Sequence, residues 1–377
     1  MATKKSTPFV RTPAQQEADQ IKRLERTQRR EQHTPSSSTP TSTSTSSVGG
    51  RRDFLDGFDQ SIGLFGDSQV ANGEAGQIFD YQQGTLKLHL ANVAGGVVKF
   101  MSHYVWNAAL VMADYIEAGD VVDIRGKRVI EFGAGAALPG ILCVKRGAQF
   151  VTLTDYPDPA IVQNLERNWF ENLVESDQDK DLRRIAGSAS FDTEAYTEIV
   201  TSAPFVKGSR RNQEEQRVKC AVRGHAWGEN VQEMLDCLPS LTQDSERAAG
   251  AGGVVTDNNN NNRRYDWVLL ADTLWVSEGH ADLLKSCLAV LNEQGKIFVC
   301  CGLHTGYNTV QRFMSLATSP AFGLQSRLVE IRRLPLWGET RSPEELQKEK
   351  ELLKEDDLEQ FSVEDRNRTV LVYELWR

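Results

Sequence analysis

The chain has 377 residues, of which 40% are hydrophobic and 25% charged, the balance of an ordinary globular protein rather than a fibrous or low-complexity one. Its net charge of −9 divides unevenly: residues 1–52 hold ten Lys/Arg against four Asp/Glu, so the remaining 325 residues carry −15. An acidic body has no excess of the Lys and Arg that neutralise phosphates, which argues against nucleic acid as a partner and suits a basic protein substrate.

The N-terminal residues 1–52 are predicted to be a disordered basic arm rich in Ser and Thr, because residues 34–47 offer almost nothing to bury. Residues 53–377 are predicted to form one domain, with surface insertions near 188–217 and 240–264. No apolar run approaches the ~18–20 residues that cross a bilayer, and the N-terminus lacks the apolar core of a secretory signal. We therefore expect a cytoplasmic protein without a membrane segment, and we expect a monomer.

Strand-like and helix-like segments then alternate along the chain. A helical run begins at Trp106, and a second helix ends at Gly147. Asp158 and Pro159 are predicted to be the N-cap and first residue of a helix through Asn172. The spacing of leucines predicts another helix over 283–291, and Gly295 is predicted to turn the chain into the next strand. Strands are predicted at 128–132, 150–154, 218–222, 267–271, 296–301, 325–334 and 369–376.

This alternation is typical of an α/β protein with a mostly parallel sheet and helices on both faces. Cys300 and Cys301 are adjacent in a predicted strand, so their side chains should face opposite sides of the sheet. The six cysteines form no C-x-x-C pair or zinc pattern, and we expect reduced thiols and no metal site.

Ligands of such sheets bind beyond the carboxyl ends of the strands, where Gly133-Ala134-Gly135 follows the strand 128–132. Glycines let the backbone pass close to a ligand, and the following helix N-terminus offers free N–H groups. A dinucleotide fingerprint would need glycine at 138, which is Leu138, and the G-K-[ST] of a P-loop is absent. A nucleoside cofactor without phosphates fits better, and a merely tight turn is the alternative.

Three further residues lie where a cofactor could bind. Asp155 ends the next predicted strand, and a carboxylate there can accept hydrogen bonds from both ribose hydroxyls, or merely begin a loop. Trp227, after the strand 218–222, could stack on adenine or belong to the core. Trp106 has the same two readings, and Asn107 beside it adds a polar group.

Five motifs in order resemble a known family: Val105-Trp-Asn-Ala108, Glu131-Phe-Gly-Ala-Gly-Ala-Ala-Leu-Pro-Gly140, Thr154-Asp-Tyr-Pro157, Trp227-Gly228 and Ala271-Asp-Thr-Leu-Trp275. They are similar to the seven-strand protein lysine methyltransferases of the methyltransferase-like 21 group, and most of all to the fungal elongation factor methyltransferases, also labelled nicotinamide N-methyltransferases. The similarity covers about residues 60–377, including 62–65.

The resemblance implies a Rossmann-like seven-strand methyltransferase fold, S-adenosyl-L-methionine as cofactor and elongation factor 1-alpha as the protein partner. By position, the cofactor contacts would be Trp106, Gly133, Ala134, Gly135, Asp155, Trp227 and Ala271. Asp272 could orient the acceptor amine or stabilise its developing charge, and the alternative is a structural residue that caps the next turn. Trp275, where the family has Tyr or Phe, would wall the acceptor channel and hold a cation by its ring face.

Three functions from different classes remain. The first is methylation of elongation factor 1-alpha at its N-terminal α-amine, a nearby lysine, or both. The second is methylation of a small molecule such as nicotinamide. The third is a non-catalytic binding module, against which the intact glycine turn and Asp155 argue.

Overall fold

The computed structural model describes residues 70–82, 84–91, 102–173, 220–238, 263–335, 342, 344–345, 348 and 353–377, all within the unit Phe54–Arg377. The predicted arm 1–52, the motif at 62–65, the insertion 188–217 and residues 240–262 of the second insertion lie outside the described residues.

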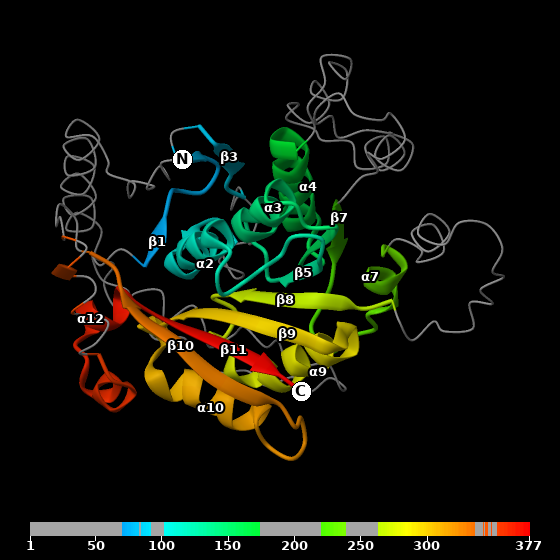
Figure 1. Ribbon diagram of the computed structural model, residues 1–377. Helices are drawn as coiled ribbons and strands as arrows, with labels where there is room; N and C mark the ends of the chain where they lie inside the picture. The colour runs from blue at the N-terminus through cyan, green and yellow to red at the C-terminus, as the bar shows by residue number, and fades with distance from the viewer. Residues whose placement is uncertain are drawn as a thin grey trace, which may run out of the picture. The chain divides into compact units, whose positions relative to one another are not determined.

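The architecture is a seven-stranded sheet in the order β10-β11-β9-β8-β5-β6-β7 (Figure 1). β11 runs antiparallel to both its neighbours, and the other strands run parallel to one another. The strands are β5 (Arg128–Phe132), β6 (Phe150–Asp155), β7 (Cys220–Gly224), β8 (Tyr265–Ala271), β9 (Leu291–Gly302), β10 (Gln325–Arg333) and β11 (Thr369–Trp376). The predicted Rossmann-like fold, with a mostly parallel sheet of seven strands, is therefore confirmed.

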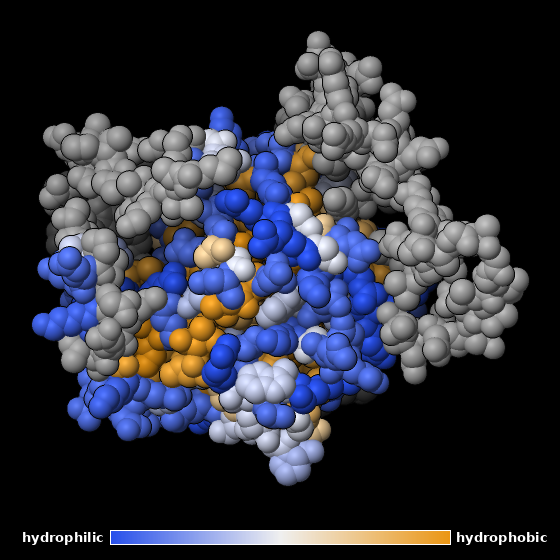
Figure 2. All heavy atoms as spheres, viewed as in Figure 1, coloured by the Kyte–Doolittle hydropathy of each residue, from blue (hydrophilic) through white to orange (hydrophobic). Residues whose placement is uncertain are grey.

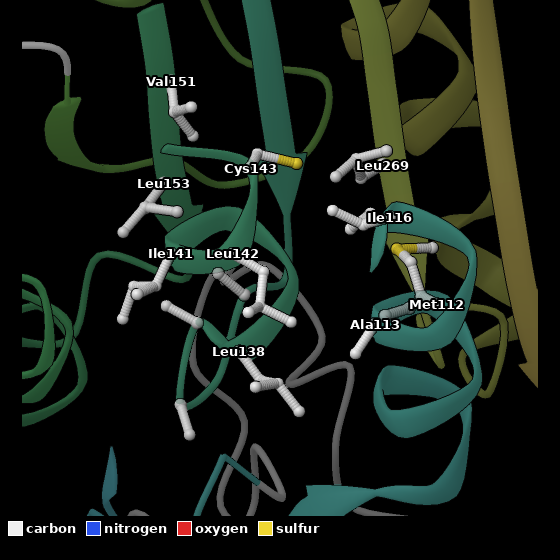
Figure 3. Packing of buried hydrophobic residues seen from close by; sticks show 14 of the residues in the cluster. Met112, Ala113, Ile116, Leu138, Ile141, Leu142, Cys143, Val151, Leu153 and Leu269 are labelled. Carbon is white, nitrogen blue, oxygen red and sulfur yellow. The ribbon is translucent and has the colours of Figure 1, made fainter. Parts of the chain in front are cut away.

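Helices cover both faces of this sheet. The helices α2 (Asn107–Ala118), α3 (Leu138–Lys145) and α4 (Pro159–Leu173) pack on one face, and α7 (Gln232–Asp236), α9 (His280–Val290) and α10 (Tyr307–Ala317) on the other. Successive strand residues alternate between the two cores: Leu269 and Cys300 face the first, Leu270 and Cys301 the second. Figure 3 shows α2 and α3 placing Met112, Ile116, Leu138 and Leu142 in the first core.

Small elements complete the described chain. They are the paired strands β1 (Ala71–Asn72) and β4 (Val105–Trp106), the hairpin β2 (Ile78–Tyr81) and β3 (Leu86–His89), the short helices η5 (Ser277–Gly279), η6 (Leu303–Thr305) and η7 (Glu355–Gln360), and α12 (Val363–Asn367). Figure 2 shows that hydrophilic side chains cover most of the coloured surface on the face seen in Figure 1. Among the described residues, no helix is long and apolar enough to cross a membrane.

Several boundaries follow the sequence prediction. Asp158 caps α4 by accepting a hydrogen bond from the N–H of Ala160 at 2.9 Å, and Pro159 is the first helical residue. Gly147 ends the turn after α3 with a φ of 95°, which glycine adopts without strain. β11 has the predicted bounds.

Other boundaries were wrong, because neighbouring strands rather than local spacing fix them. β7 continues two residues past its predicted end, in the register that pairs Gly224 with Asp155, while residues 218 and 219 of its predicted start lie outside the described residues. Gly295 does not separate helix from strand: it lies inside β9, in an irregularity between Leu291 and Lys296.

The start of the first predicted helix was also wrong. Trp106 has an extended backbone and pairs with Ala71, so α2 begins one residue later, at Asn107.

Candidate active site

The candidate site lies at the carboxyl ends of β5, β6, β8 and β9. Open α/β sheets bind their ligands beyond the carboxyl ends of their strands. The strand order places β5 between β6 and β8, so the residues that follow these strands come together although they are far apart in the sequence. The predicted glycine turn follows β5, Asp155 ends β6, and Asp272 follows β8.

The glycine turn has an unusual backbone. Gly133, Gly135 and Ala137 have φ values of 65°, 55° and 63°, in the left-handed region that favours glycine. A Cβ at Gly133 would also lie 2.9 Å from Cγ2 of Thr273, closer than real Cβ contacts come. The N–H of Ala134 donates to the carbonyl of Thr154 at 2.9 Å, which fixes the turn against β6. The turn thus presents bare backbone to the site.

Asp155 is held beside this turn by two backbone amides. The N–H of Gly135 donates to Oδ2 at 2.8 Å, and the N–H of Tyr156 donates to Oδ1 at 2.7 Å. Burial raises the pKa of the Asp155 carboxyl to about 6, and the two amide hydrogen bonds oppose that rise. The group is therefore mainly ionised at neutral pH. Each oxygen keeps further acceptor capacity for a pair of ribose hydroxyls.

Glu131, on β5, fixes the first turn of α3 to the sheet. The sequence analysis did not assign it this role. Its side chain is fully buried, and Oε2 accepts a hydrogen bond from the N–H of Gly140 at 2.9 Å. Burial raises the pKa of this carboxyl to about 8, with a smaller contribution from Asp155. Glu131 is thus mainly protonated at neutral pH.

Trp227 lies against the glycine turn. Its Cζ2 would be 3.8 Å from a Cβ on Gly133, and its Cε3 would be 3.2 Å from one on Gly279. The loop that carries it is fixed to α9 because Oγ of Ser286 accepts from the N–H of Gly228 at 2.8 Å and bonds Nε2 of His225 at 2.9 Å. The indole is half-buried, so one part of it can still meet a ligand.

Asp272 directly follows Ala271, the last residue of β8, and its backbone is strained. Its φ is 58°, a value that Asp and Asn tolerate better than other side chains do. Oδ1 accepts a hydrogen bond from the N–H of Gly302 at 3.0 Å, while Oδ2 is buried and has no hydrogen-bond partner. A buried carboxylate oxygen without a hydrogen bond is costly, so Oδ2 is a candidate to accept one from a ligand.

His304 is the site residue that the sequence analysis missed. Its Nδ1 lies 3.9 Å from Oδ2 of Asp272, and both side chains are almost fully buried. The imidazole stacks on the indole of Trp106, with ring centroids 5.2 Å apart and planes inclined by 19°. His304 follows β9 by two residues, so the rule that located Asp155 and Asp272 could have found it.

The predicted site residues therefore fall into two adjoining groups. The glycine turn, Asp155 and Trp227 form one, and Asp272, His304 and Trp106 form the other. Thr273 joins them, because it follows Asp272 and packs on Gly133. Trp106 thus lies with Asp272 rather than at the glycine turn. Ala271 is the last residue of β8, and Trp275 is half-buried in the turn before η5.

These residues fit a nucleoside cofactor that carries an amino acid rather than phosphates. The carboxylate of Asp155 suits ribose hydroxyls, and the bare turn lets the ligand approach the backbone. Leu138, in the place of the third fingerprint glycine, is the first residue of α3 and lies in the core at 1% exposure. The third glycine of a pyrophosphate-binding fingerprint is therefore replaced by a core residue.

Comparison with known proteins agrees with this geometry. Residues 88–180 match the family model described as lysine methyltransferase, a span that contains Trp106, the glycine turn and Asp155. The chain is similar to a protein of Yarrowia lipolytica named protein N-terminal and lysine N-methyltransferase EFM7, with 29% identity over 65% of this chain and 73% of the relative. A protein of the same name from Schizosaccharomyces pombe is 26% identical over 63% of this chain and 71% of its own.

Solved structures are more distant. A SAM-dependent methyltransferase from Agrobacterium tumefaciens has a TM-score of 0.36 and 12% identity, covering 81% of this chain and 72% of that one. The resemblance drawn from the sequence motifs is confirmed by the family model and by the curated relatives.

Proposed function

We propose that this protein, an S-adenosylmethionine-dependent methyltransferase, methylates elongation factor 1-alpha at its N-terminal α-amine, a nearby lysine, or both, as a monomer in the cytoplasm. The names of the relatives, which pair a protein N-terminus with lysine, support a protein nitrogen as the acceptor. The charge of −15 on residues 53–377 supports a basic substrate segment.

The observation that carries the proposal is the unpartnered Oδ2 of Asp272. A buried carboxylate oxygen gains most from a donor that is itself charged, and a protein amine supplies N–H groups to it. The ring nitrogen of nicotinamide has no hydrogen to donate and needs no deprotonation, and the N–H groups of its carboxamide are uncharged. The site is therefore better matched to an amine than to a pyridine.

The cofactor, when bound, supplies an electrophilic methyl group on a sulfonium. The chain's own residues have three tasks. Asp155 and the glycine turn would hold the cofactor's ribose and amino-acid end, while Asp272 would orient the acceptor nitrogen. Trp275 would wall the channel and hold the cationic amine by its ring face.

The two candidate amines differ in the cost of deprotonation. An α-amine titrates near ~8 and a lysine near ~10.4, so at pH 7.4 neutralising the lysine costs about 4 kcal/mol and the α-amine under about 1 kcal/mol. The α-amine is thus the easier acceptor. Lysine methylation should rise more steeply than α-amine methylation as the pH increases toward 9.

The decisive assay supplies purified elongation factor 1-alpha and free nicotinamide separately, each with labelled cofactor. Mass spectrometry of the protein then maps the methylated nitrogen and counts the methyl groups. We expect label in the first peptide of the protein substrate. Label in nicotinamide alone would replace this proposal with the small-molecule one.

The division of the chain into a basic arm, residues 1–52, and one catalytic domain, residues 53–377, with insertions near 188–217 and 240–264, is also a proposal. It rests on composition, since residues 34–47 contain almost no side chain that could join a core. Limited proteolysis tests it: cleavage should concentrate in these three segments, and early cleavage elsewhere would contradict it.

A further inference from the structure

The pair formed by Asp272 and His304 has a geometry suited to one nitrogen. Nδ1 of His304 and Oδ2 of Asp272 are 3.9 Å apart, too far for a direct hydrogen bond. For a nitrogen placed about 2.8 Å from both atoms, the angle at that nitrogen between Nδ1 and Oδ2 would be about 90°. A single ammonium group could therefore donate one hydrogen bond to each. The separation thus matches a guest amine rather than an internal contact.

The imidazole is held in this position from three sides. Trp106 stacks on its face, and the carboxylate of Asp272 lies beside Nδ1. On a third side the backbone of Gly302 passes so close that a Cβ there would collide with Nδ1. Gly302 also donates its N–H to Oδ1 of Asp272, which turns Oδ2 toward the imidazole. Such support is typical of a positioned functional group.

We propose that His304 is the proton acceptor for the substrate amine, which it binds together with Asp272. This inference rests on the proposed function, because only a protonated amine needs a proton acceptor. With its own proton on Nε2, neutral His304 presents the Nδ1 lone pair. One N–H bond of the ammonium breaks, its electron pair stays on nitrogen, and the proton joins Nδ1.

The rest of the step balances without another reactant. Rotation about the C–N bond turns the new lone pair to the methyl carbon, a C–N bond forms, and the C–S electron pair remains on sulfur. The carboxylate of Asp272 stabilises the imidazolium that has formed, and His304 then releases its proton to solvent. The transfer moves the positive charge from the ammonium to the imidazole within one buried pair, so it separates no charge.

Other titratable groups lie on the elements packed against η6, which are α10, α12 and β11. Many of these groups are paired: Tyr307 and Tyr373 donate to Glu355, Asp365 binds Arg368, and Glu374 binds Lys296 and Arg327. The remaining ones are Arg312, Glu364 and Arg366. On β9, burial raises the pKa values of the Cys300 and Cys301 thiols well above their ordinary range.

The test compares His304→Asn with wild type on an N-terminal peptide of elongation factor 1-alpha. We expect kcat to fall about tenfold at pH 7, because only about a tenth of an α-amine that titrates near ~8 is neutral there without a proton acceptor. At pH 9.5 the α-amine is already neutral in solution, and the variant should come within about threefold of wild type. Added imidazole should restore activity to His304→Ala at pH 7. His89→Asn, which changes a histidine paired with Glu171 instead, should leave the pH profile unchanged.

Two readouts do not depend on turnover. Calorimetry should show unchanged S-adenosylmethionine affinity in His304→Asn, which also demonstrates that it folds. In wild type, ¹⁵N spectroscopy of the complex with S-adenosylhomocysteine and peptide at pH 7 should show the His304 ring becoming an imidazolium when the peptide binds. Two outcomes overturn the inference. One is an equal loss of kcat in His304→Asn at pH 7 and pH 9.5 with no rescue of His304→Ala by imidazole. The other is a His304 ring that stays neutral when the peptide binds.

The measurements on the wild-type protein distinguish the proposed function from the proposed role of His304. Wild type that labels only nicotinamide contradicts the proposed function, and His304 then has no proton to accept. Wild type that labels the peptide, combined with variants whose loss does not vary with pH, contradicts the role of His304 alone.

Discussion

The backbone N–H of Gly135 donates a hydrogen bond to Oδ2 of Asp155 at 2.8 Å. This contact joins the turn after β5 to the end of β6, and it orients the carboxylate that would meet the cofactor's ribose. The glycine turn and Asp155, the candidate ribose-binding residue, are therefore joined directly, so a substitution at either should change the affinity for the cofactor.

Asp155→Ala should weaken S-adenosylmethionine binding by about 1.5–3 kcal/mol, the scale of hydrogen bonds to a charged group. That corresponds to about 10- to 150-fold in affinity, measured by calorimetry. Asp123→Ala is the matched control. Asp123 is an exposed carboxylate that precedes β5, so it lies at the amino ends of the strands, away from the candidate site. Unchanged affinity in folded Asp155→Ala would remove this residue from the site.

Cofactor affinity should also depend on pH. Because burial raises the pKa of Asp155 to about 6, the carboxylate becomes protonated as the pH falls through that value and loses acceptor capacity. We expect affinity to fall about tenfold between pH 7.5 and 5. Glu131, with its pKa raised to about 8, is already protonated in this range. Asp155→Asn should bind weakly at both pH values, and a wild type with flat affinity would contradict the assignment.

Glu131→Gln should remove a pH dependence of stability. The folded-state pKa of Glu131 is about 8, above its unfolded value near ~4.3. The stability that this carboxyl contributes is therefore fully present below ~4.3 and is lost as the pH rises through 8. Glutamine keeps the acceptor for the N–H of Gly140 and has no proton to lose. The free energy of unfolding of Glu131→Gln, relative to wild type, should therefore increase from pH 5 to pH 8.5.

Urea denaturation at the two pH values measures this difference. Glu293→Gln, which changes an exposed glutamate in β9, is the control and should show a much smaller change. A Glu131→Gln difference that is constant with pH would mean that the buried carboxyl is not protonated in the folded state.

Asn168→Ala should destabilise the protein by about 2–4 kcal/mol, because it leaves buried backbone groups without partners. The fully buried Asn168 accepts from the N–H of His89 at 2.6 Å, and its Nδ2 donates to the carbonyls of His89 and Ala136. Ala136 belongs to the turn before α3, so cofactor affinity should fall as well. Asn172→Ala removes similar bonds to Lys87 at the surface and should cost about 1 kcal/mol. Equal losses of unfolding free energy would contradict this difference in burial.

Asp272→Asn should lower kcat by about 100-fold or more and leave cofactor affinity nearly unchanged. Asparagine tolerates the φ of 58° and can still accept from the N–H of Gly302, so the backbone should be preserved. What is lost is the negative charge at Oδ2. Asp282→Asn, in α9 and half-exposed, is the control and should keep wild-type kcat. Full activity in Asp272→Asn would show that the acceptor amine is held elsewhere.

Local sequence patterns determined much of this protein. The alternation of strands and helices predicted the sheet, the Asp158-Pro159 pair fixed the start of α4, and the glycine turn followed by Asp155 indicated a nucleoside site. The helix start and the strand and helix pattern depend on conformational preferences that act over a few residues, and the nucleoside site was indicated by two such local patterns at the ends of successive strands.

The tertiary structure alone decided which strand ends meet and what burial does to their side chains. The order β9-β8-β5-β6 brings His304 to Asp272 and places Thr273 on Gly133, contacts that spacing along the chain does not encode. The pKa of Asp155 is set by desolvation, which exists only once the sheet is covered. Strand pairing and solvent exclusion are properties of the whole fold, so the local sequence can place His304 after a strand but cannot show that it meets Asp272, 32 positions away.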